Sequence, residues 1–182
     1  MTAVGYRPGV GCNTIHHVRW RDGEFMVSDE RGLLDLDVIH GYLLRSYWAE
    51  NIPREVVERS IAGSLCFGLY HLGESRPQDG AGVSAPAPRT QIGFARTVTD
   101  CATFAYLADV FVLEQWRGRG LSKLMMRSLM AHPQLQGLRR WMLATADAHG
   151  LYRQFGFDAQ ADPGRIMEIV DREIYRRPRA TR

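Results

Sequence analysis

An apolar run that leads into a glycine-rich turn and then a helical pattern restricts the fold of this chain most. Residues 104–113 read FAYLADVFVL, and their β-branched and aromatic content predicts a central strand covered on both faces. From Leu121 onward, apolar residues recur at helical spacing until Pro133, which predicts an amphipathic helix. A strand, a turn and a helix in this order indicate an α/β fold class.

The rest of the 182-residue chain carries shorter patterns of both kinds. Between 73 and 90 lie glycines, prolines and few apolar residues, a composition that predicts a flexible loop, more typical of a tolerated surface insertion than of a lid. Strands outnumber helices, so we expect a mixed sheet of the α+β kind. Further strands are predicted at 25–27, 65–70, 91–99, 141–143 and 166–170, and further helices at 36–47 (capped by Asp35), 53–63 and 149–155.

The turn between the long strand and the long helix has the chemistry of an anion site. Gly118 and Gly120 leave backbone N–H groups open at the positive end of the helix, and such a site suits a pyrophosphate. Arg117 and Arg119 add positive charge beside it. Two glycines before a helix also fit an ordinary turn, and the sequence matches neither the dinucleotide fingerprint nor a P-loop.

Two motifs give this turn a family resemblance. Gln115-x-x-Gly118-x-Gly120 resembles the Q/R-x-x-G-x-G/A signature of the GNAT N-acetyltransferase superfamily, and residues 148–157 resemble the family's A-x-x-L-Y-x-x-x-G-F segment. The resemblance covers residues 104–157 at the level of motifs and about 25–170 as an order of elements. It implies a GNAT-like fold, with a mostly antiparallel, twisted central sheet that is splayed at the cofactor site and flanked by helices.

The resemblance also implies a cofactor and the residues that hold it. Acetyl-coenzyme A would place its pyrophosphate on the loop amides and its pantetheine arm along the end of the long strand, much as an added strand pairs with a sheet. Many relatives have Asn where this chain has Thr145, which could still bond the cofactor or the backbone. The expected cofactor-binding residues are Phe111, Val112, Gln115, Arg117, Gly118, Arg119, Gly120, Leu121, Ser122 and Thr145.

Two residues are candidates for proton transfer. By the resemblance, Tyr152 would donate a proton to the departing thiolate, a task that suits a phenol with an ordinary pKa of about 10. The same tyrosine could instead be a helix aromatic packed on the sheet. Asp109 lies within the apolar strand, where an unpaired carboxylate is costly, so it is a candidate general base. Its alternatives are a structural role, bonded to backbone or to Arg96, and a water chain that carries the proton in its place.

The acceptor pocket is less well defined by the sequence. The family places it between the first two helices and the far ends of the central strands, which here means Tyr47, Trp48, Asn51 and Arg96. Aromatic side chains with an arginine suit a small amine that also carries a carboxylate, such as an amino acid. The same aromatic pair is equally typical of a packed helix end.

The resulting hypothesis is a single acetyltransferase domain, residues 1–182, with a loop at 73–90 and a basic tail at 171–182. It would move an acetyl group from acetyl-CoA by direct attack of an amine, with a small-molecule acceptor favoured. One alternative is an acyl-CoA-binding sensor or scaffold without catalysis. Another is a protein N-acetyltransferase whose tail or 73–90 loop contacts its substrate.

Charge and cysteine content bear on partners and location. The tail holds five arginines against two acidic residues, which already accounts for the net charge of +3, so the neutral body of the chain disfavours nucleic acid. Cys12, Cys66 and Cys101 form neither a disulfide framework nor a zinc site, which predicts a reduced, cytoplasmic protein. No metal is expected, and no apolar run is long enough for a membrane span. The resemblance allows a homodimer, since many relatives are dimers.

Overall fold

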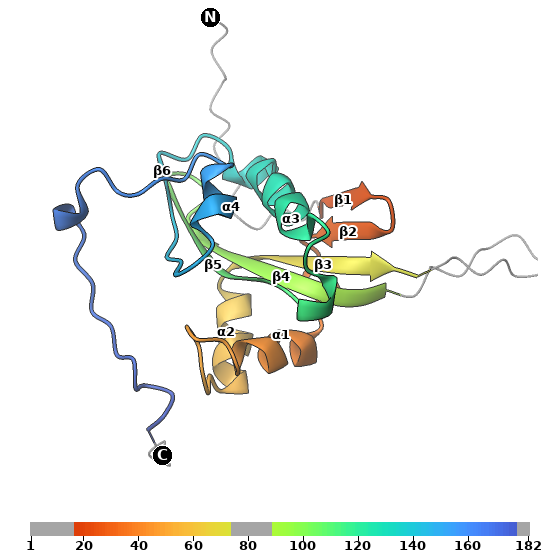
Figure 1. Cartoon of the computed structure of the whole chain (residues 1–182), viewed down its shortest axis with the longest axis horizontal. Coiled ribbons are helices and arrows are strands. Elements are labelled where there is room, and N and C mark those ends of the chain that lie inside the picture. The colour runs from red at the N-terminus through yellow and green to blue at the C-terminus, as the bar shows by residue number, and fades with distance from the viewer. Residues whose placement is uncertain (1–16, 74–88, 178–182) are drawn as a thin grey trace, which may run out of the picture.

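A six-stranded sheet forms the centre of the computed structural model, which describes residues 17–73 and 89–177 (Figure 1). Neighbouring strands are antiparallel from the first to the fifth, and the sixth runs parallel to the fifth. This confirms the mixed α/β fold class with a mostly antiparallel sheet. The strands, in sheet order, are β1 (Arg19–Asp22), β2 (Phe25–Ser28), β3 (Leu65–Leu72), β4 (Arg89–Thr99), β5 (Phe104–Val112) and β6 (Arg140–Met142).

Helices cover both faces of the sheet. In Figure 1, α1 (Leu36–Leu43) and α2 (Arg54–Ala62) lie on one face, and α3 (Leu121–Met130) and α4 (His149–Arg153) lie on the other. As predicted, the Asp35 side chain caps α1, where it accepts hydrogen bonds from two backbone N–H groups of the first turn. Single 3-10 turns complete the helical elements: η1 (Arg31–Leu33), η2 (Glu114–Trp116), η3 (Pro133–Leu135) and η4 (Pro163–Arg165).

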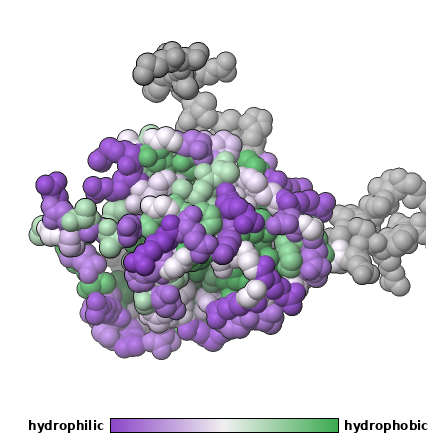
Figure 2. Space-filling view, turned by 45° about the horizontal axis from the view of Figure 1, so that its top comes forward, coloured by the Kyte–Doolittle hydropathy of each residue, from purple (hydrophilic) through white to green (hydrophobic). Residues whose placement is uncertain are grey.

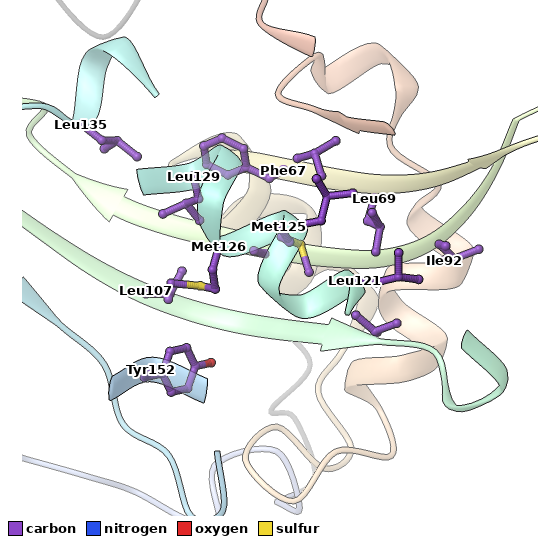
Figure 3. Packing of buried hydrophobic residues seen from close by; sticks show 14 residues of the cluster. Phe67, Leu69, Ile92, Leu107, Leu121, Met125, Met126, Leu129, Leu135 and Tyr152 are labelled. Carbon is purple, nitrogen blue, oxygen red and sulfur yellow. The ribbon is translucent and has the colours of Figure 1, made fainter. Parts of the chain in front are cut away.

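Each face of the sheet buries its own apolar cluster. On the α3 face, Met125, Met126 and Leu129 point from the helix onto sheet residues that include Phe67 and Leu107 (Figure 3). On the α1–α2 face, the second cluster contains Ile39, Leu43 and Val57 of the helices, with Phe94 and Phe111 of the sheet. Because β5 supplies residues to both clusters, the prediction of a central strand covered on both faces is confirmed.

The sheet opens between its last two strands. The pairing of β5 with β6 extends only from Phe104 opposite Arg140 to Tyr106 opposite Met142. The rest of β5 pairs with β4 alone, so the segment after β6 diverges and leaves a gap beside the second half of β5. The predicted splayed sheet is therefore present.

Four details of the sequence analysis need correction. Residues 166–170 form no strand: they are exposed and have no neighbouring strand within the described chain, since a β-branched pattern cannot itself supply one. The strand β1 was not predicted, because its polar sequence RWRD lacks an alternating pattern. Residues 89–90 begin β4, and 74–88 lie outside the described ranges. Cys101 is disulfide-bonded, which the spacing of the cysteines did not predict.

Three further predictions concern membrane spans, location and the basic tail. In the ranges that the structure describes, no helix is long and apolar enough to cross a membrane. The Cys101 disulfide contradicts the prediction of reduced cysteines, and the cytoplasmic location that was based on it stays a prediction. The basic tail is described as far as residue 177, where Arg176 pairs with Glu50 at 2.6 Å and Arg177 pairs with Asp171 at 2.9 Å.

Candidate active site

Two adjoining cavities occupy the gap where the sheet is splayed. They measure about 490 Å³ and 560 Å³. Tyr47, Trp48, Val110, Ala148 and Tyr152 line both of them, so the cavities meet around these side chains. We call the first the α3-side cavity, because it continues toward the start of α3, and the second the β4-side cavity, because Arg96 of β4 lines it.

The turn that precedes α3 has the backbone expected of an anion site. Gly118 (φ 79°) and Gly120 (φ 76°) adopt left-handed conformations, which glycine reaches without strain. No side chain caps the helix, and a Cβ added to either glycine would meet nothing within 4 Å, so the space in front of the first turn is open. A smaller hollow of about 290 Å³ at this turn shares Val112, Arg117 and Ser122 with the α3-side cavity. The helix N-terminus and the cavity therefore form one connected surface.

The two arginines of the turn are held by protein groups. Arg117 donates to the carbonyl oxygen of Val112 at 3.1 Å and to the Tyr42 hydroxyl at 2.9 Å. Arg119 lies over the Trp116 ring, with its guanidinium carbon 4.9 Å from the ring centroid. These contacts hold both arginine side chains, and no side chain caps the start of α3.

Other residues expected to bind the cofactor are distributed unevenly. Val112 and Phe111 line the α3-side cavity, and the Phe111 ring stacks on Tyr42 at 3.8 Å. Gln115 is exposed on η2 and lines none of the cavities described above. The Thr145 hydroxyl accepts a hydrogen bond from the Ala148 backbone N–H at 3.0 Å, so it supports the start of α4.

Tyr152 lies on α4 at the junction of the cavities. Its side chain is 8% exposed and meets the Phe157 ring edge-on at 5.9 Å. Burial, with smaller effects of Tyr47 and Asp147, raises the pKa of Tyr152 to about 12. The phenol therefore keeps its proton throughout the physiological range, as a proton donor must. The packing role weighed for this residue is present in the structure, and its catalytic role stays a prediction.

Asp109 lies in a β-bulge of β5. The register between β4 and β5 shifts at this point, and Asp109 has φ 54°, a left-handed conformation that is rare for a residue with a side chain. Its carboxylate accepts hydrogen bonds from Arg96 Nε at 2.8 Å and from Trp48 Nε1 at 3.2 Å. Arg96 also donates to Ser64 Oγ at 3.2 Å. The structural role that was weighed for Asp109 thus has its partner, and the carboxylate still borders the β4-side cavity.

The expected acceptor residues are only partly brought together. Tyr47 and Trp48 line both cavities, and the Tyr47 hydroxyl accepts from the Ala146 N–H at 3.2 Å, across the gap. Asn51 lies in a turn with φ 63° and borders neither cavity. Three residues that the sequence analysis did not consider complete the walls, since no local pattern indicates them: Tyr42 in the α3-side cavity, and Tyr106 and Tyr175 in the β4-side cavity.

Cys66 and the side chains that could ligate a metal bear on two other kinds of chemistry. Burial raises the pKa of the Cys66 thiol to about 12, and this cysteine lines neither cavity, so it is not an activated nucleophile. Within residues 17–73 and 89–177, no group of three or more His, Cys, Asp or Glu side chains could hold a metal ion.

Comparisons with known proteins agree with this geometry. Residues 84–159 match the family model described as an acetyltransferase (GNAT) domain. A Gibberella zeae protein named "Putative acetyltransferase FG08082" is 34% identical over 141 residues, which are 73% of this chain and 78% of that protein.

Solved structures lead to the same family. A Xanthomonas campestris pv. campestris protein, whose crystal structure is described as belonging to the GNAT family, has 46% identity and a TM-score of 0.70, with 83% of this chain and 96% of that chain covered. A Deinococcus radiodurans R1 structure with 17% identity shares the fold, at a TM-score of 0.59 over 90% of this chain and 100% of the other. The chain with the splayed sheet and the glycine turn before α3 therefore belongs to the GNAT family of acetyltransferases.

Proposed function

We propose that this acetyltransferase uses acetyl-CoA to acetylate the nitrogen of a small amine. The observation that carries the proposal is the meeting of two cavities at Tyr152, one continuous with the α3 turn and the other bordered by Arg96 and Asp109. In a direct transfer, the acetyl donor and the acceptor bind in separate cavities and react where the cavities meet. The Tyr152 phenol lies at this junction.

The residues present fit the donor. The amides from Gly118 to Ser122 suit a pyrophosphate, because they lie at the positive end of α3 and no side chain caps this helix. The Arg117 N–H is not among them, since it donates to the Glu114 carbonyl oxygen at 3.2 Å. The α3-side cavity then leads past Phe111 and Val112, where a pantetheine arm would lie, to Tyr152. In this proposal the thioester would lie at the entrance to the β4-side cavity.

The proposed reaction is a direct transfer. The acceptor nitrogen attacks the thioester carbonyl carbon, so a C–N bond forms and the C–S bond breaks. The Asp109 carboxylate, directly or through a water, takes one proton from the acceptor ammonium, which makes the nitrogen nucleophilic. As the amide forms, the Tyr152 hydroxyl gives its proton to the departing sulfur and takes up the second proton that the nitrogen must lose. No covalent enzyme intermediate is needed.

The β4-side cavity favours an acceptor that carries both charges. Asp109 and Arg96 set a negative and a positive group side by side, and Trp48, Tyr106 and Tyr175 provide aromatic walls. An amine with a nearby carboxylate, such as an amino acid, complements this arrangement, because its ammonium and carboxylate can each face an opposite charge.

A thiol-release assay tests the proposal. Full-length protein and acetyl-CoA are incubated with amino acids, polyamines and peptides, and Tyr152→Phe is compared with Tyr70→Phe. Tyr70 is a matched control, since it is buried, borders neither cavity, and its hydroxyl has no partner among the described residues. We expect release with one acceptor class, a loss of roughly 10²-fold or more in Tyr152→Phe, and little change in Tyr70→Phe.

The pH dependence sharpens this test. Because burial raises the pKa of Tyr152 from 10 to about 12, its proton is present at every pH well below 12. The ratio of wild-type to Tyr152→Phe rates should therefore stay constant from neutral pH to pH 10. A ratio that halves at pH 10 would indicate an ordinary phenol. If acetyl-CoA binds but no acceptor releases thiol, the chain is a binding protein for these compounds and the proposal fails.

A further inference from the structure

Asp147 lies in the loop between β6 and α4, at the open part of the sheet. It borders both the α3-side cavity and the β4-side cavity. Among the described residues that line both cavities, it is the only one that carries a charge at neutral pH. The proposed acetyl transfer gives this carboxylate no part.

Hydrogen bonds hold the backbone on either side of Asp147. The Ala146 N–H donates to the Tyr47 hydroxyl at 3.2 Å, and the Ala148 N–H donates to the Thr145 hydroxyl at 3.0 Å. The first of these bonds joins the loop to the segment that follows α1, on the other side of the gap. The neighbours of Asp147 therefore keep it at the junction of the cavities.

Within residues 17–73 and 89–177, the carboxylate of Asp147 accepts no hydrogen bond and forms no ion pair. It is exposed, and no side chain of the described residues caps α4, so the carboxylate is not used to begin that helix. Hydrophilic side chains are spread over the face of the molecule in Figure 2, so an exposed carboxylate alone is not unusual here. Its place on both cavities is what distinguishes Asp147.

The other charges of the β4-side cavity neutralise each other. In the described chain, the charged residues that line this cavity are Arg96, Asp109 and Asp147. Arg96 pairs with Asp109 at 2.8 Å, and the other oxygen of Asp109 accepts from Trp48 Nε1 at 3.2 Å. Each oxygen of Asp109 thus already has a donor. The excess charge of the cavity is negative, and Asp147 supplies it.

Apart from Asp147, the α3-side cavity has an excess of positive charge. Its other charged residues in the described chain are Arg45, Arg117 and Glu114. Arg117 pairs with Glu114 at 3.2 Å, which leaves the charge of Arg45, an exposed residue that does not line the β4-side cavity. A cationic acceptor is therefore repelled on the side proposed for acetyl-CoA and attracted on the other side.

The carboxylate of Asp147 also acts on Tyr152. Burial has the largest effect on the raised pKa of Tyr152, and the charges of Tyr47 and Asp147 add to it. A cation bound by Asp147 would therefore lie close to the phenol at the junction.

We propose that Asp147 binds the ammonium group of the acceptor at the junction, so that the enzyme selects amines that enter with a positive charge. This inference rests on the proposed function. A charge-assisted hydrogen bond from the ammonium to the free carboxylate holds the nitrogen beside Tyr152, and Asp109 then takes the first proton from it. Asp147 stays ionised throughout, so it binds the acceptor and transfers no proton.

The kinetics of Asp147→Asn, measured by thiol release from the full-length protein at neutral pH, test this role. One probe is the most reactive amine of the amino-acid, polyamine and peptide panel, which enters as an ammonium ion. The other is hydroxylamine, which is mostly uncharged at this pH. We expect the KM for the charged amine to rise about tenfold or more and the KM for acetyl-CoA to change less than about twofold, because only the acceptor loses a charge-assisted bond. The loss of kcat/KM should be much smaller with hydroxylamine.

Two further variants control for position and for charge. Asp158→Asn removes another exposed carboxylate, which lies 3.8 Å from Arg153 and borders neither cavity, so its kinetics should match the wild type. Asp147→Glu keeps the negative charge and should recover most of the affinity for the charged amine.

The outcomes separate this inference from the proposed function. If the wild type acetylates an amine and Asp147→Asn has the same KM for it, the role of Asp147 is wrong and the proposed function stands. Equal losses with hydroxylamine and with the charged amine would also overturn the role, because charge recognition would then not be involved. If the wild type acetylates no amine, the proposed function fails, and the role of Asp147 fails with it.

Discussion

Asp109 combines, at one residue, a left-handed backbone with a paired carboxylate. The bulge turns its side chain away from the regular alternation of β5, toward Arg96 and Trp48. A left-handed conformation is costly for a residue with a Cβ, so the surrounding contacts must maintain it. Strain of this kind, next to a cavity, is typical of a functional position.

The backbone and the carboxylate of Asp109 can be separated by mutation. Asp109→Gly and Asp109→Ala both remove the hydrogen bonds to Arg96 and Trp48, but only alanine keeps the Cβ that opposes φ 54°. We expect Asp109→Ala to be less stable than Asp109→Gly by about 1 kcal/mol in urea unfolding. Equal stabilities would contradict the bulge geometry. If the carboxylate is the base, both variants should lose kcat to a similar extent.

At the scale of elements, the proposed site depends on the short strand β6 and on the N-terminus of α3. Since β6 pairs with β5 over only three residue pairs, the remaining length of β5 borders the cavities instead of another strand. The helix α3 is anchored by Leu121, Met125 and Leu129 in the larger core cluster, so its N-terminus is held rigidly at the end of the α3-side cavity.

Substitution of one glycine tests whether the turn before α3 binds acetyl-CoA. Gly120 is the N-cap of α3 with φ 76°, and an added Cβ meets no atom within 4 Å. Gly120→Ala should therefore cost about 1 kcal/mol through backbone strain alone, and it should raise the KM for acetyl-CoA, because the amides of the turn shift.

Gly150→Ala in α4 is the control for this change. Its Cβ also meets nothing, and the Gly150 backbone is not left-handed, so both stability and KM should stay close to wild type. If both alanine variants keep the same stability and the same KM for acetyl-CoA, the turn is not part of the acetyl-CoA site.

Across the whole molecule, a buried polar link joins the start of the sheet to the end of α3. Asp29, after β2, accepts from the Val18 N–H at 2.7 Å, and its other oxygen lies 3.0 Å from His132 Nε2. The side chains of Asp29 and His132 are 6% and 3% exposed, and His132 Nδ1 accepts from the Gln134 N–H at 3.2 Å. The network adds polar bonds between these two elements to the contact of the Trp20 ring with the His132 ring, whose centroids are 6.0 Å apart.

Removal of this link should lower the free energy of unfolding substantially. Asp29→Ala leaves the Val18 N–H and the His132 ring without their buried acceptor, so we expect a loss of about 3 kcal/mol in the free energy of unfolding. Asp22→Ala is the control, because Asp22 is exposed and lies 3.6 Å from Arg127, an ion pair that contributes little. Urea denaturation of both variants measures the difference, and a loss as small as that of Asp22→Ala would contradict a structural role of the link.

The sequence by itself determined the elements whose signals are local. The run at 104–113, the glycine turn and the apolar spacing after Leu121 predict β5, the anion site and α3, because each pattern depends on neighbours along the chain. The capping of α1 by Asp35 is equally local. The two motifs at 115–120 and 148–157 were enough to indicate the family for the same reason.

Only the tertiary structure decided which residues meet. The bonds from Arg96 and Trp48 to Asp109, and the positions of Tyr106 and Tyr175 on one cavity, join residues far apart in the sequence. The strand pattern at 166–170 predicts a segment suited to pairing, but it cannot show whether the segment lies beside a strand edge, and in the described chain it pairs with none. A side-chain pattern sets local backbone preference, whereas partners depend on how the whole chain packs.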